Sequence, residues 1–192
     1  TFAALAVSSI AGYGFEIYHD KAKDTVMAIL MLAMMVPFVA VLVPLFQMFT
    51  KAKLINSWTG FILPSIATPF LIMYFRNSAR SFPRDTLEAA RIDGLNEFQI
   101  FIRMFIPMMK PTYASAATIT FMGAWNAYLW PKVVMQTNEA ITMPMLVANT
   151  MGGYVIDYGV VMAAVTICSL PTVIIFFCLQ KSFTNAVAGA VK

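Results

Sequence analysis

The side chains that could carry covalent, acid–base or metal chemistry are few in this sequence. His19 is the only histidine, and no serine or cysteine pairs with it as nucleophile and base. There is no His-x-x-x-His pair or cysteine cluster for a metal, and no Gly-x-x-x-x-Gly-Lys loop for a nucleotide. Cys168 and Cys178 lie ten residues apart in one apolar segment, about 80° out of phase at about 100° per residue, so we expect buried, unpaired thiols. The sequence therefore predicts no catalytic residue, no metal site and no cofactor.

One segment contains many polar residues, whereas most of the sequence consists of apolar runs. It has the pattern of two short helices joined at a tight turn. Pro83 can open the first helix, because a missing N–H costs nothing in the first turn, and Asp85 and Glu88 then lie near the positive end of its dipole. Gly94, directly after Asp93, ends this helix, since glycine accepts the left-handed backbone that closes a helix.

The second helix of this segment begins at Asn96, whose spacing of three from Gln99 is typical of a helix cap. Pro107 is expected to stop it. The apolar stripe, at spacings of three and four, consists of Phe98, Phe101, Ile102 and Phe105. The small residues at which a partner could pack closely are Ala89, Ala90 and Gly94. The sequence thus predicts a compact amphipathic helix-turn-helix.

The composition places this segment in a membrane protein. The chain is 60% hydrophobic and 11% charged, and a soluble core of 192 residues would leave too much of this apolar surface in water. Because it begins with Thr1 inside an apolar run, we expect an upstream part, with any signal or first span, to be missing. The arginines lack a stacking platform or a recognition helix, so nucleic-acid binding is not indicated.

Five apolar segments have membrane-spanning character, at residues 1–18, 25–49, 58–75, 112–130 and 158–179. The first is rich in small residues, which would allow close helix packing. The second, about 25 residues or about 37 Å at about 1.5 Å per residue, can cross a hydrocarbon layer of about 30 Å. Pro37 and Pro44 share a face within it, which predicts a kinked helix, either for packing alone or beside a water-filled path. Pro64 and Pro69 make the third irregular.

The basic residues set the predicted orientation. With alternating spans, residues 19–24, 76–110 and 180–192 face one compartment and hold ten of the 13 Lys and Arg, whereas the loops at 51–57 and 132–157 hold three. By the positive-inside rule the side with ten is cytoplasmic, so the helix-turn-helix and the C-terminus are predicted to face the cytoplasm.

Several residues at fixed spacing on this cytoplasmic segment resemble a motif of a known protein family. It consists of Glu88-Ala89-Ala90, Gly94 four residues on, and the closing Ile106-Pro107. In this spacing, between two spans, the set resembles the EAA loop of the membrane subunits of bacterial ATP-binding-cassette importers.

The likeness extends over nearly the whole chain and is to the maltose-type, or carbohydrate, class of these permeases. Residues similar to the fifth-helix region of that class are Pro107, Lys110-Pro111, Phe121, Trp125-Asn126 and Pro131. Residues similar to its final helix and tail are Asp157-Tyr158-Gly159, Met162-Ala163-Ala164, Leu170-Pro171, Gln180-Lys181 and Ala188-Gly189-Ala190-Val191-Lys192.

This resemblance implies an all-α, polytopic transmembrane helical bundle with type I importer permease topology, in which residues 1–192 form one permease domain with five of six spans. It implies a multi-pass protein of the bacterial cytoplasmic (inner) membrane that is not itself an enzyme, because a partner subunit hydrolyses ATP. Residues 77–109 would be the coupling segment on which that ATPase docks, through Glu88, Ala89, Ala90, Asp93, Gly94, Ile106 and Pro107. The other implied partners are a second permease subunit, an extracytoplasmic solute-binding protein, the carbohydrate substrate and membrane lipid.

The resemblance also implies a translocation path lined by Trp125, Asn126 and Tyr128, because sugars are held by stacking on aromatic rings and by hydrogen bonds. Trp130 offers the same chemistry, but we interpret it as part of an interfacial aromatic belt, and a belt is the alternative for Trp125. Asn126 fits a belt less well, since an amide at this depth needs a partner or water. The loop at 137–154 would contact the solute-binding protein.

Three alternatives stay open. The segment could be an amphipathic helix pair lying on the membrane surface, although this does not account for the spacing of its small residues and proline. The chain could be a membrane scaffold or assembly subunit with a static docking helix. It could also be a permease for a non-sugar solute. An ion-coupled carrier is disfavoured, because the sequence holds no intramembrane carboxylate pair.

Overall fold

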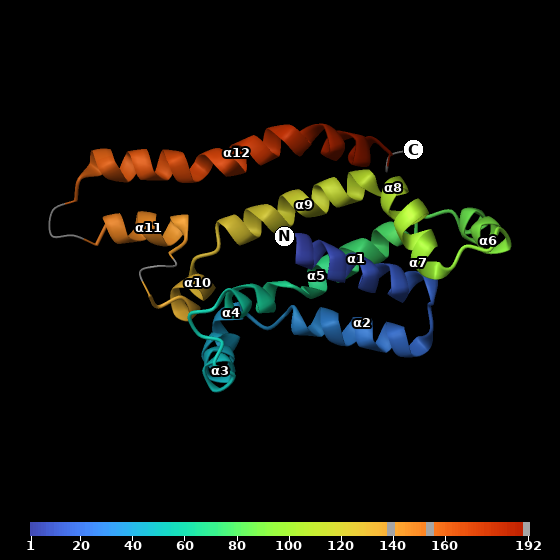
Figure 1. The fold of residues 1–192 in the computed structure, drawn as a ribbon, viewed down its shortest axis with the longest axis horizontal. Coiled ribbons are helices and arrows are strands. Elements are labelled where there is room, and N and C mark those ends of the chain that lie inside the picture. Colours follow the sequence, from blue (N-terminus) through green and yellow to red (C-terminus); the bar gives the residue numbers. More distant parts are fainter. Residues whose placement is uncertain (138–140, 153–155, 190–192) are drawn as a thin grey trace. The chain divides into compact units, whose positions relative to one another are not determined.

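The computed structural model describes residues 1–137, 141–152 and 156–189, with side chains as far as Cys178, and every regular element in them is a helix (Figure 1). In chain order these are α1 (Phe2–Ile17), α2 (Lys21–Ala33), α3 (Phe38–Lys51), α4 (Trp58–Ile62), the 3₁₀ turn η1 (Leu63–Ser65), α5 (Pro69–Ala79), α6 (Arg84–Ile92), α7 (Glu97–Ile100), the π-helix η2 (Phe101–Phe105), α8 (Ile106–Met108), α9 (Lys110–Trp125), α10 (Leu129–Val134), α11 (Met143–Thr150) and α12 (Tyr158–Gly189). The prediction of an all-α protein is confirmed for these residues.

The chain divides into two compact units, and α9 and α12 each contribute residues to both of them. Unit 1 comprises Thr1–Met35, Ile66–Ala117 and Leu179–Lys192, and unit 2 comprises Val36–Ser65 and Thr118–Cys178. The predicted coupling segment lies in unit 1, and the predicted path residues lie in unit 2. Each candidate site is therefore positioned by a separate set of helices.

In unit 1 the small residues of α1 pack against α5. Ala4, Ser8 and Gly12 follow one another at spacings of four, and all three are buried. A Cβ atom added at Gly12 would lie 2.6 Å from the Cβ of Phe75 and 2.9 Å from the carbonyl oxygen of Ile72. The two backbones are thus as close as a glycine allows, and the predicted close-packing face is confirmed.

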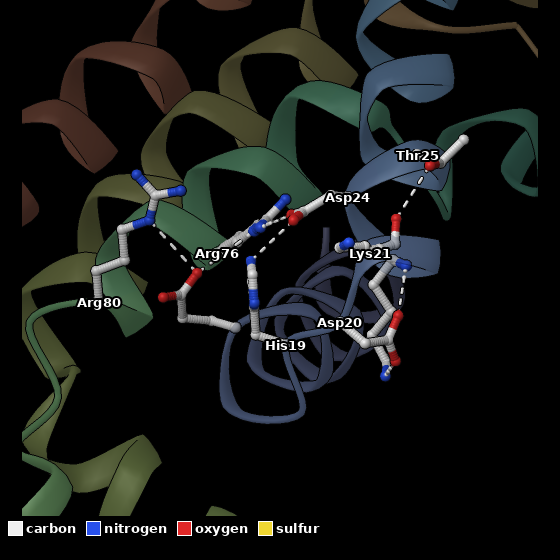
Figure 2. A network of polar contacts seen from close by, with 9 residues as sticks. His19, Asp20, Lys21, Asp24, Thr25, Arg76 and Arg80 are labelled. Carbon is white, nitrogen blue, oxygen red and sulfur yellow. Dashed lines mark hydrogen bonds and ion pairs between the residues drawn. The ribbon is translucent and has the colours of Figure 1, made fainter.

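A polar network joins the ends of α1, α2 and α5 (Figure 2). The buried guanidinium of Arg76 donates from Nη2 to Oδ1 of Asp24 at 2.5 Å and from Nε to Oε2 of Glu16 at 3.4 Å. Arg80 donates to the same Glu16 oxygen at 3.4 Å, and Nε2 of His19 lies 2.9 Å from Oδ2 of Asp24. Because a buried arginine needs opposite charge and filled hydrogen bonds, these contacts hold the helix that leads into α6.

In unit 2 a small core forms around Trp130. Its ring meets Phe49 edge-on at 5.1 Å between centroids, and its Nε1 donates to the carbonyl oxygens of Gly60 and Phe61, each at 3.2 Å. Only 7% of Trp130 is exposed. Trp130 is therefore a core residue that joins α10 to α3 and α4, and its prediction as a belt residue is wrong.

The second predicted span is two helices rather than one kinked helix. α2 ends at Ala33, and α3 begins after Pro37, which occupies its N-cap. Proline has no N–H to donate and disfavours the helical conformation of the residue before it, so the helix ends and restarts instead of bending. Pro44 is tolerated inside α3. The third predicted span is irregular as expected, because α4, η1 and α5 follow one another with Pro69 at the start of α5.

The later spans differ from the predicted bounds. α9 ends at Trp125, short of the predicted Trp130, and α12 continues to Gly189, into the part of the chain that was expected to be a polar, small-residue tail. The predicted loop at 132–157 contains the end of α10 and all of α11. The prediction of a loop was wrong because the sequence signals there were turn residues, whereas Pro144 sits in the first turn of α11, a position that proline suits.

Length and hydropathy single out a few of the described helices as able to cross a membrane. Tyr158–Cys178 within α12 does so alone, and the number rises to three if α2 with α3, and α4–η1 with α5, each count as one interrupted span. α1 and α9 have 16 residues each, fewer than the about 20 that a perpendicular crossing needs. Both cysteines are unpaired as predicted, but Cys178 is exposed, because the outer face of α12 has little protein against it.

Candidate functional site

The first helix of the candidate coupling segment, α6, has a buried and an exposed face. Pro83 was predicted to be the first residue of this helix, but it is the N-cap, directly before the first helical residue. Asp85 lies in the first turn. Leu87 and Ala90 are buried, at 6% and 2% exposed. The exposed face carries Glu88, Ala89 and Asp93, together with Ile92, which is 86% exposed. Ala90 thus positions α6 instead of lining its outer face, and Ile92 is an exposed apolar residue that the family motif does not include.

The turn after α6 is built as predicted. Gly94 has φ +79°, and the N–H of Leu95 donates to the carbonyl of Ala90 at 3.0 Å. A Cβ atom at Gly94 would meet nothing within 4 Å. Glycine is therefore required here by backbone conformation and not by lack of space.

The cap of the next helix is also confirmed. The side chain of Asn96 accepts from the N–H of Gln99 at 2.9 Å, and the Gln99 side chain accepts from the N–H of Asn96 at 3.0 Å. This reciprocal capping box satisfies two backbone donors that would otherwise be unpaired at the start of α7.

Pro107 does not stop the second helix. The chain passes from α7 into the π-helix η2, where Ile106 donates to the carbonyl of Phe101, five residues back. Pro107 then stands in the first turn of α8, where its missing N–H is not needed, and the chain turns at Met109 into α9. Pro107 is exposed, and Ile106 is half-buried.

The π-helix also changes which side chains face inward. Phe101 and Phe105 are buried as predicted, but Phe98 is 71% exposed and Ile102 is 43% exposed. Ile100, which the predicted stripe left out, is fully buried. The stripe was predicted at 3.6 residues per turn, and the wider π turn shifts the residues that repeat on one face.

The buried faces of this segment are anchored on α1. Tyr13 of α1 meets Phe101 at 5.2 Å and Phe105 at 4.8 Å, both edge-on, and Phe82 meets Phe105 at 5.5 Å. The full buried cluster consists of Tyr13, Ala79, Phe82, Leu87, Ala90, Ile100, Phe101, Phe105 and Met109. The segment is therefore fixed to a helix far away in sequence and is not a free surface arm.

An ion pair closes the segment across its turn. Nε of Arg91 donates to Oε1 of Glu97 at 2.7 Å, and both side chains are about two-fifths exposed. This hydrogen bond from Arg91 is the main reason that the pKa of Glu97 lies below its ordinary value. The carboxylate is charged at neutral pH and adds to the capping box in holding α6 and α7 together.

The candidate path residues lie at the end of α9 in unit 2. Nε1 of Trp125 donates to the carbonyl of Cys168 at 2.9 Å, and its ring stacks on Phe121. The indole N–H and one face of the Trp125 ring therefore already make contacts within the protein. Nζ of Lys132 donates to the hydroxyl oxygen of Tyr128 at 2.6 Å, so that oxygen already accepts one hydrogen bond and its O–H can still donate.

Asn126 is the predicted path residue with a group left over. It is exposed, and its Nδ2 donates to the carbonyl of Met122 at 2.9 Å, which leaves Oδ1 to accept from a ligand. It borders a cavity of about 210 Å³ shared with α11 and α12. The other lining residues are Pro144, Val147, Val165, Cys168 and Ser169. Sequence analysis missed these five, because no periodicity relates α11 to α12. No group of three metal-ligating side chains occurs in the part of the chain that the structure describes.

Comparison with known proteins extends the likeness over both units. A family model described as "Binding-protein-dependent transport system inner membrane component" matches residues 4–189. The lactose transport system permease protein LacG of Rhizobium radiobacter is 42% identical over 192 residues, covering 100% of this chain and 70% of that protein. The arabinooligosaccharides transport system permease protein AraQ of Bacillus subtilis (strain 168) is 35% identical over 193 residues, covering 100% and 69%.

A solved structure has the same fold. The crystal structure of a bacterial ABC transporter involved in the import of the acidic polysaccharide alginate contains a chain with TM-score 0.84 and 22% identity to this one. The match covers 94% of this chain and 69% of that chain. The likeness in fold therefore includes nearly all of the helices described above.

Proposed function

We propose how this chain carries out transport from the premise that it belongs to the family of inner membrane components of binding-protein-dependent transport systems. It is a permease subunit of an ATP-binding-cassette importer for carbohydrate, with the type I permease fold, in the inner membrane. In our proposal residues 1–192 act as one permease domain. A second permease subunit, cytoplasmic ATP-binding subunits and an extracytoplasmic solute-binding protein complete the transporter.

The observation that carries the proposal is the two-faced construction of residues 77–109. The inner face of α6 and η2 is buried against Tyr13 of α1, and the outer face presents Glu88, Ala89 and Ile92. A rigid element that is exposed on one side and packed on a transmembrane helix on the other can pass a displacement from a docked subunit into the membrane domain.

The outer face of α6 has the chemistry of a docking surface. Within the described residues Glu88 has no ion-pair partner, so its carboxylate is available to a basic group of the ATPase subunit. Ala89 lets a groove close around the helix, and Ile92, which is 86% exposed, supplies apolar area for it. Asp93 and Gly94 border this face at the turn, and Pro107 is exposed in α8. The ATPase subunit supplies all the ATP chemistry, because this sequence has no phosphate-binding loop.

The orientation of the segment follows from charge. The side that holds ten of the 13 basic residues includes residues 76–110 and 180–192, so in our proposal the coupling segment and the C-terminus face the cytoplasm. In our proposal Trp125, Asn126 and Tyr128, at and after the end of α9, line the translocation path. Parts of two further predicted regions lie outside the described residues. These parts are residues 138–140 and 153–154 of the predicted binding-protein loop, and residues 190–192 of the C-terminal tail.

The test is to purify the complete complex from detergent extract through a C-terminal tag on this subunit. We expect an ATP-binding subunit and a second permease to copurify, and a sugar-loaded binding protein to stimulate ATP hydrolysis. Glu88→Lys should leave the subunit inserted but abolish the stimulation. Lys21→Glu, a charge reversal at an exposed residue of the same predicted side but outside residues 77–109, is the matched control and should retain it.

Two results would contradict the proposal. Recovery of no ATPase would mean that residues 77–109 do not dock one. Recovery of an ATPase whose activity ignores the sugar-loaded binding protein would favour a static scaffold.

A further inference from the structure

The cavity beside Asn126 is formed by three helices of unit 2 and has a volume of about 210 Å³. Asn126 follows α9, Pro144 and Val147 belong to α11, and Cys168 and Ser169 belong to α12. The indole of Trp125 fixes two of these helices to each other, because it donates to the backbone carbonyl of Cys168 at 2.9 Å. One wall of the cavity is therefore held by a hydrogen bond between the Trp125 side chain and the backbone of α12.

Its polar groups offer two hydrogen-bond acceptors and one donor. Asn126 uses one of the two N–H groups of Nδ2 on the carbonyl of Met122, so Oδ1 can accept from a ligand and the second N–H can donate to it. Ser169 donates its hydroxyl hydrogen to the carbonyl of Val165 at 2.8 Å, which leaves the lone pairs of Oγ to accept. A ligand that matches these groups carries hydroxyls, which can both donate and accept.

The charge of the lining selects among such ligands. None of the six lining residues is basic, so the cavity offers no cationic partner to a carboxylate or a phosphate. The remaining wall consists of Pro144, Val147 and Val165, which suit the C–H faces of a sugar ring. The chemistry therefore fits a neutral carbohydrate and disfavours an anionic one.

The volume limits how much of a carbohydrate enters. A cavity of 210 Å³ holds about seven water molecules at about 30 Å³ each, and it is smaller than the pockets of about 300 to 1,000 Å³ that enclose drug-sized ligands. It accommodates a single ring of a longer sugar, with the rest of the molecule outside it.

We infer that this cavity is a subsite for one neutral sugar ring, in which Asn126 and Ser169 accept hydrogen bonds from the ring hydroxyls. The inference rests on the proposed function and deepens it, since it assigns to this subunit a direct contact with substrate and a preference for uncharged carbohydrate.

The two native cysteines provide the probe. Cys168 lines the cavity, whereas Cys178 is exposed on the same helix ten residues further on. The complete complex in lipid nanodiscs is treated with 2-aminoethyl methanethiosulfonate, and the modification rate of each cysteine is followed by peptide mass spectrometry. We expect the sugar that stimulates ATP hydrolysis, chosen from lactose, arabinotriose and digalacturonate, to slow modification of Cys168 several-fold. The modification rate of Cys178 should not change when the sugar is added.

A pair of variants tests the hydrogen bond from serine. Ser169→Ala removes one neutral acceptor, so the sugar concentration that half-protects Cys168 should rise about two- to tenfold. Thr166→Ala is the control, because Thr166 lies on the same helix, is exposed and bonds the carbonyl of Met162 in the same way, but does not line the cavity. Its half-protecting concentration should equal that of the wild type.

The outcomes separate this inference from the proposed function. If no sugar and binding protein stimulate ATP hydrolysis, the proposed function fails. If a neutral sugar stimulates ATP hydrolysis but changes neither the modification rate of Cys168 nor, in Ser169→Ala, the sugar concentration that half-protects Cys168, the subsite is wrong and the importer assignment stands. Stimulation by digalacturonate alone, or a Cys168 that does not react without sugar, also overturns the subsite.

Discussion

At the scale of single residues, the turn between α6 and α7 depends on one backbone conformation and one ion pair. Gly94 supplies the left-handed conformation with open space around it, and the Asn96–Gln99 box together with Arg91 and Glu97 closes the two helices on each other. Substitutions here change the angle at which α6 is presented without touching the buried cluster.

Gly94→Val should uncouple the transporter. A β-branched residue at positive φ costs about 1–2 kcal/mol, which the exposed turn relieves by moving α6. We expect sugar-stimulated ATP hydrolysis to fall while the subunit still inserts and binds its partner permease. Gly94→Asn is the matched control, because asparagine tolerates the left-handed region. Equal activity of the two variants would show that the conformation of Gly94 does not matter for coupling.

Glu97 predicts a pH dependence at the same turn. Its pKa is lowered in the folded chain, so its contribution is fully present above the ordinary glutamate pKa of about 4.3 and is lost as pH falls through the lower folded value. Hydrogen exchange of residues 93–99, corrected for intrinsic rates, should therefore be constant from pH 7 to about 5 and rise below that. The effect is small, at about 0–1 kcal/mol, because the pair is partly exposed. The Glu97→Gln variant should exchange at every pH as fast as the wild type does at low pH. If exchange in Glu97→Gln still depended on pH, another titrating group would be responsible for the pH dependence.

At the scale of elements, the α1–α5 contact holds the transmembrane part to the coupling segment. The contact was foreseen from small residues in α1, but the glycine that matters could not be identified, because Gly12 and Gly14 look equivalent in the sequence. In the structure Gly12 touches the α5 backbone and Gly14 faces open space.

Gly12→Ala and Gly14→Ala should therefore have opposite effects. The new methyl at Gly12 would lie 2.6 Å from the Cβ of Phe75 and 2.7 Å from the N of Arg76, so the helices must separate, at a cost of about 1–3 kcal/mol. At Gly14 the methyl meets nothing within 4 Å, and alanine should be neutral or stabilise by about 0.5–1 kcal/mol. The thermal inactivation midpoint of the purified complex measures both. A lower midpoint for Gly14→Ala than for Gly12→Ala would contradict the packing described here.

The ends of elements show where reasoning from the sequence succeeds and fails. The Gly94 turn and the Asn96 cap were predicted correctly, because their signals are local. The break at Pro37 was predicted as a kink, and Pro107 was predicted as a stop, because proline only removes a donor, and the surrounding turns decide whether the helix breaks, widens or continues.

At the scale of the whole molecule, coupling requires that motion of α6 reach a membrane helix. In our proposal the contact of Tyr13 with Phe101 and Phe105 makes this connection within unit 1. The window of α12 that can cross a membrane is only 6% buried, so lipid and partner subunits must cover most of its surface.

Tyr13→Ala should separate ATP hydrolysis from transport. Removing the ring deletes two edge-on contacts, each about 0.5–1.5 kcal/mol beyond area burial, but leaves the outer face of α6 unchanged. We expect the ATPase subunit still to copurify, with fewer sugar molecules imported per ATP hydrolysed in proteoliposomes. Tyr13→Phe keeps the ring and should behave as the wild type. An unchanged ratio in Tyr13→Ala would mean that α1 does not carry the displacement.

The sequence by itself determined the helical class, the membrane setting and the family, and it indicated a candidate coupling segment, because composition, proline and glycine placement and motif spacing are properties of neighbouring residues. Tertiary structure alone decided that Ala90 and Trp130 are buried, that Phe98 and Ile102 are exposed, and that Asn126 shares a cavity with Ser169. Those facts depend on which helices meet, and on a π turn that shifts the phase of a face. Contacts between helices far apart in the chain leave no periodic mark on either of them.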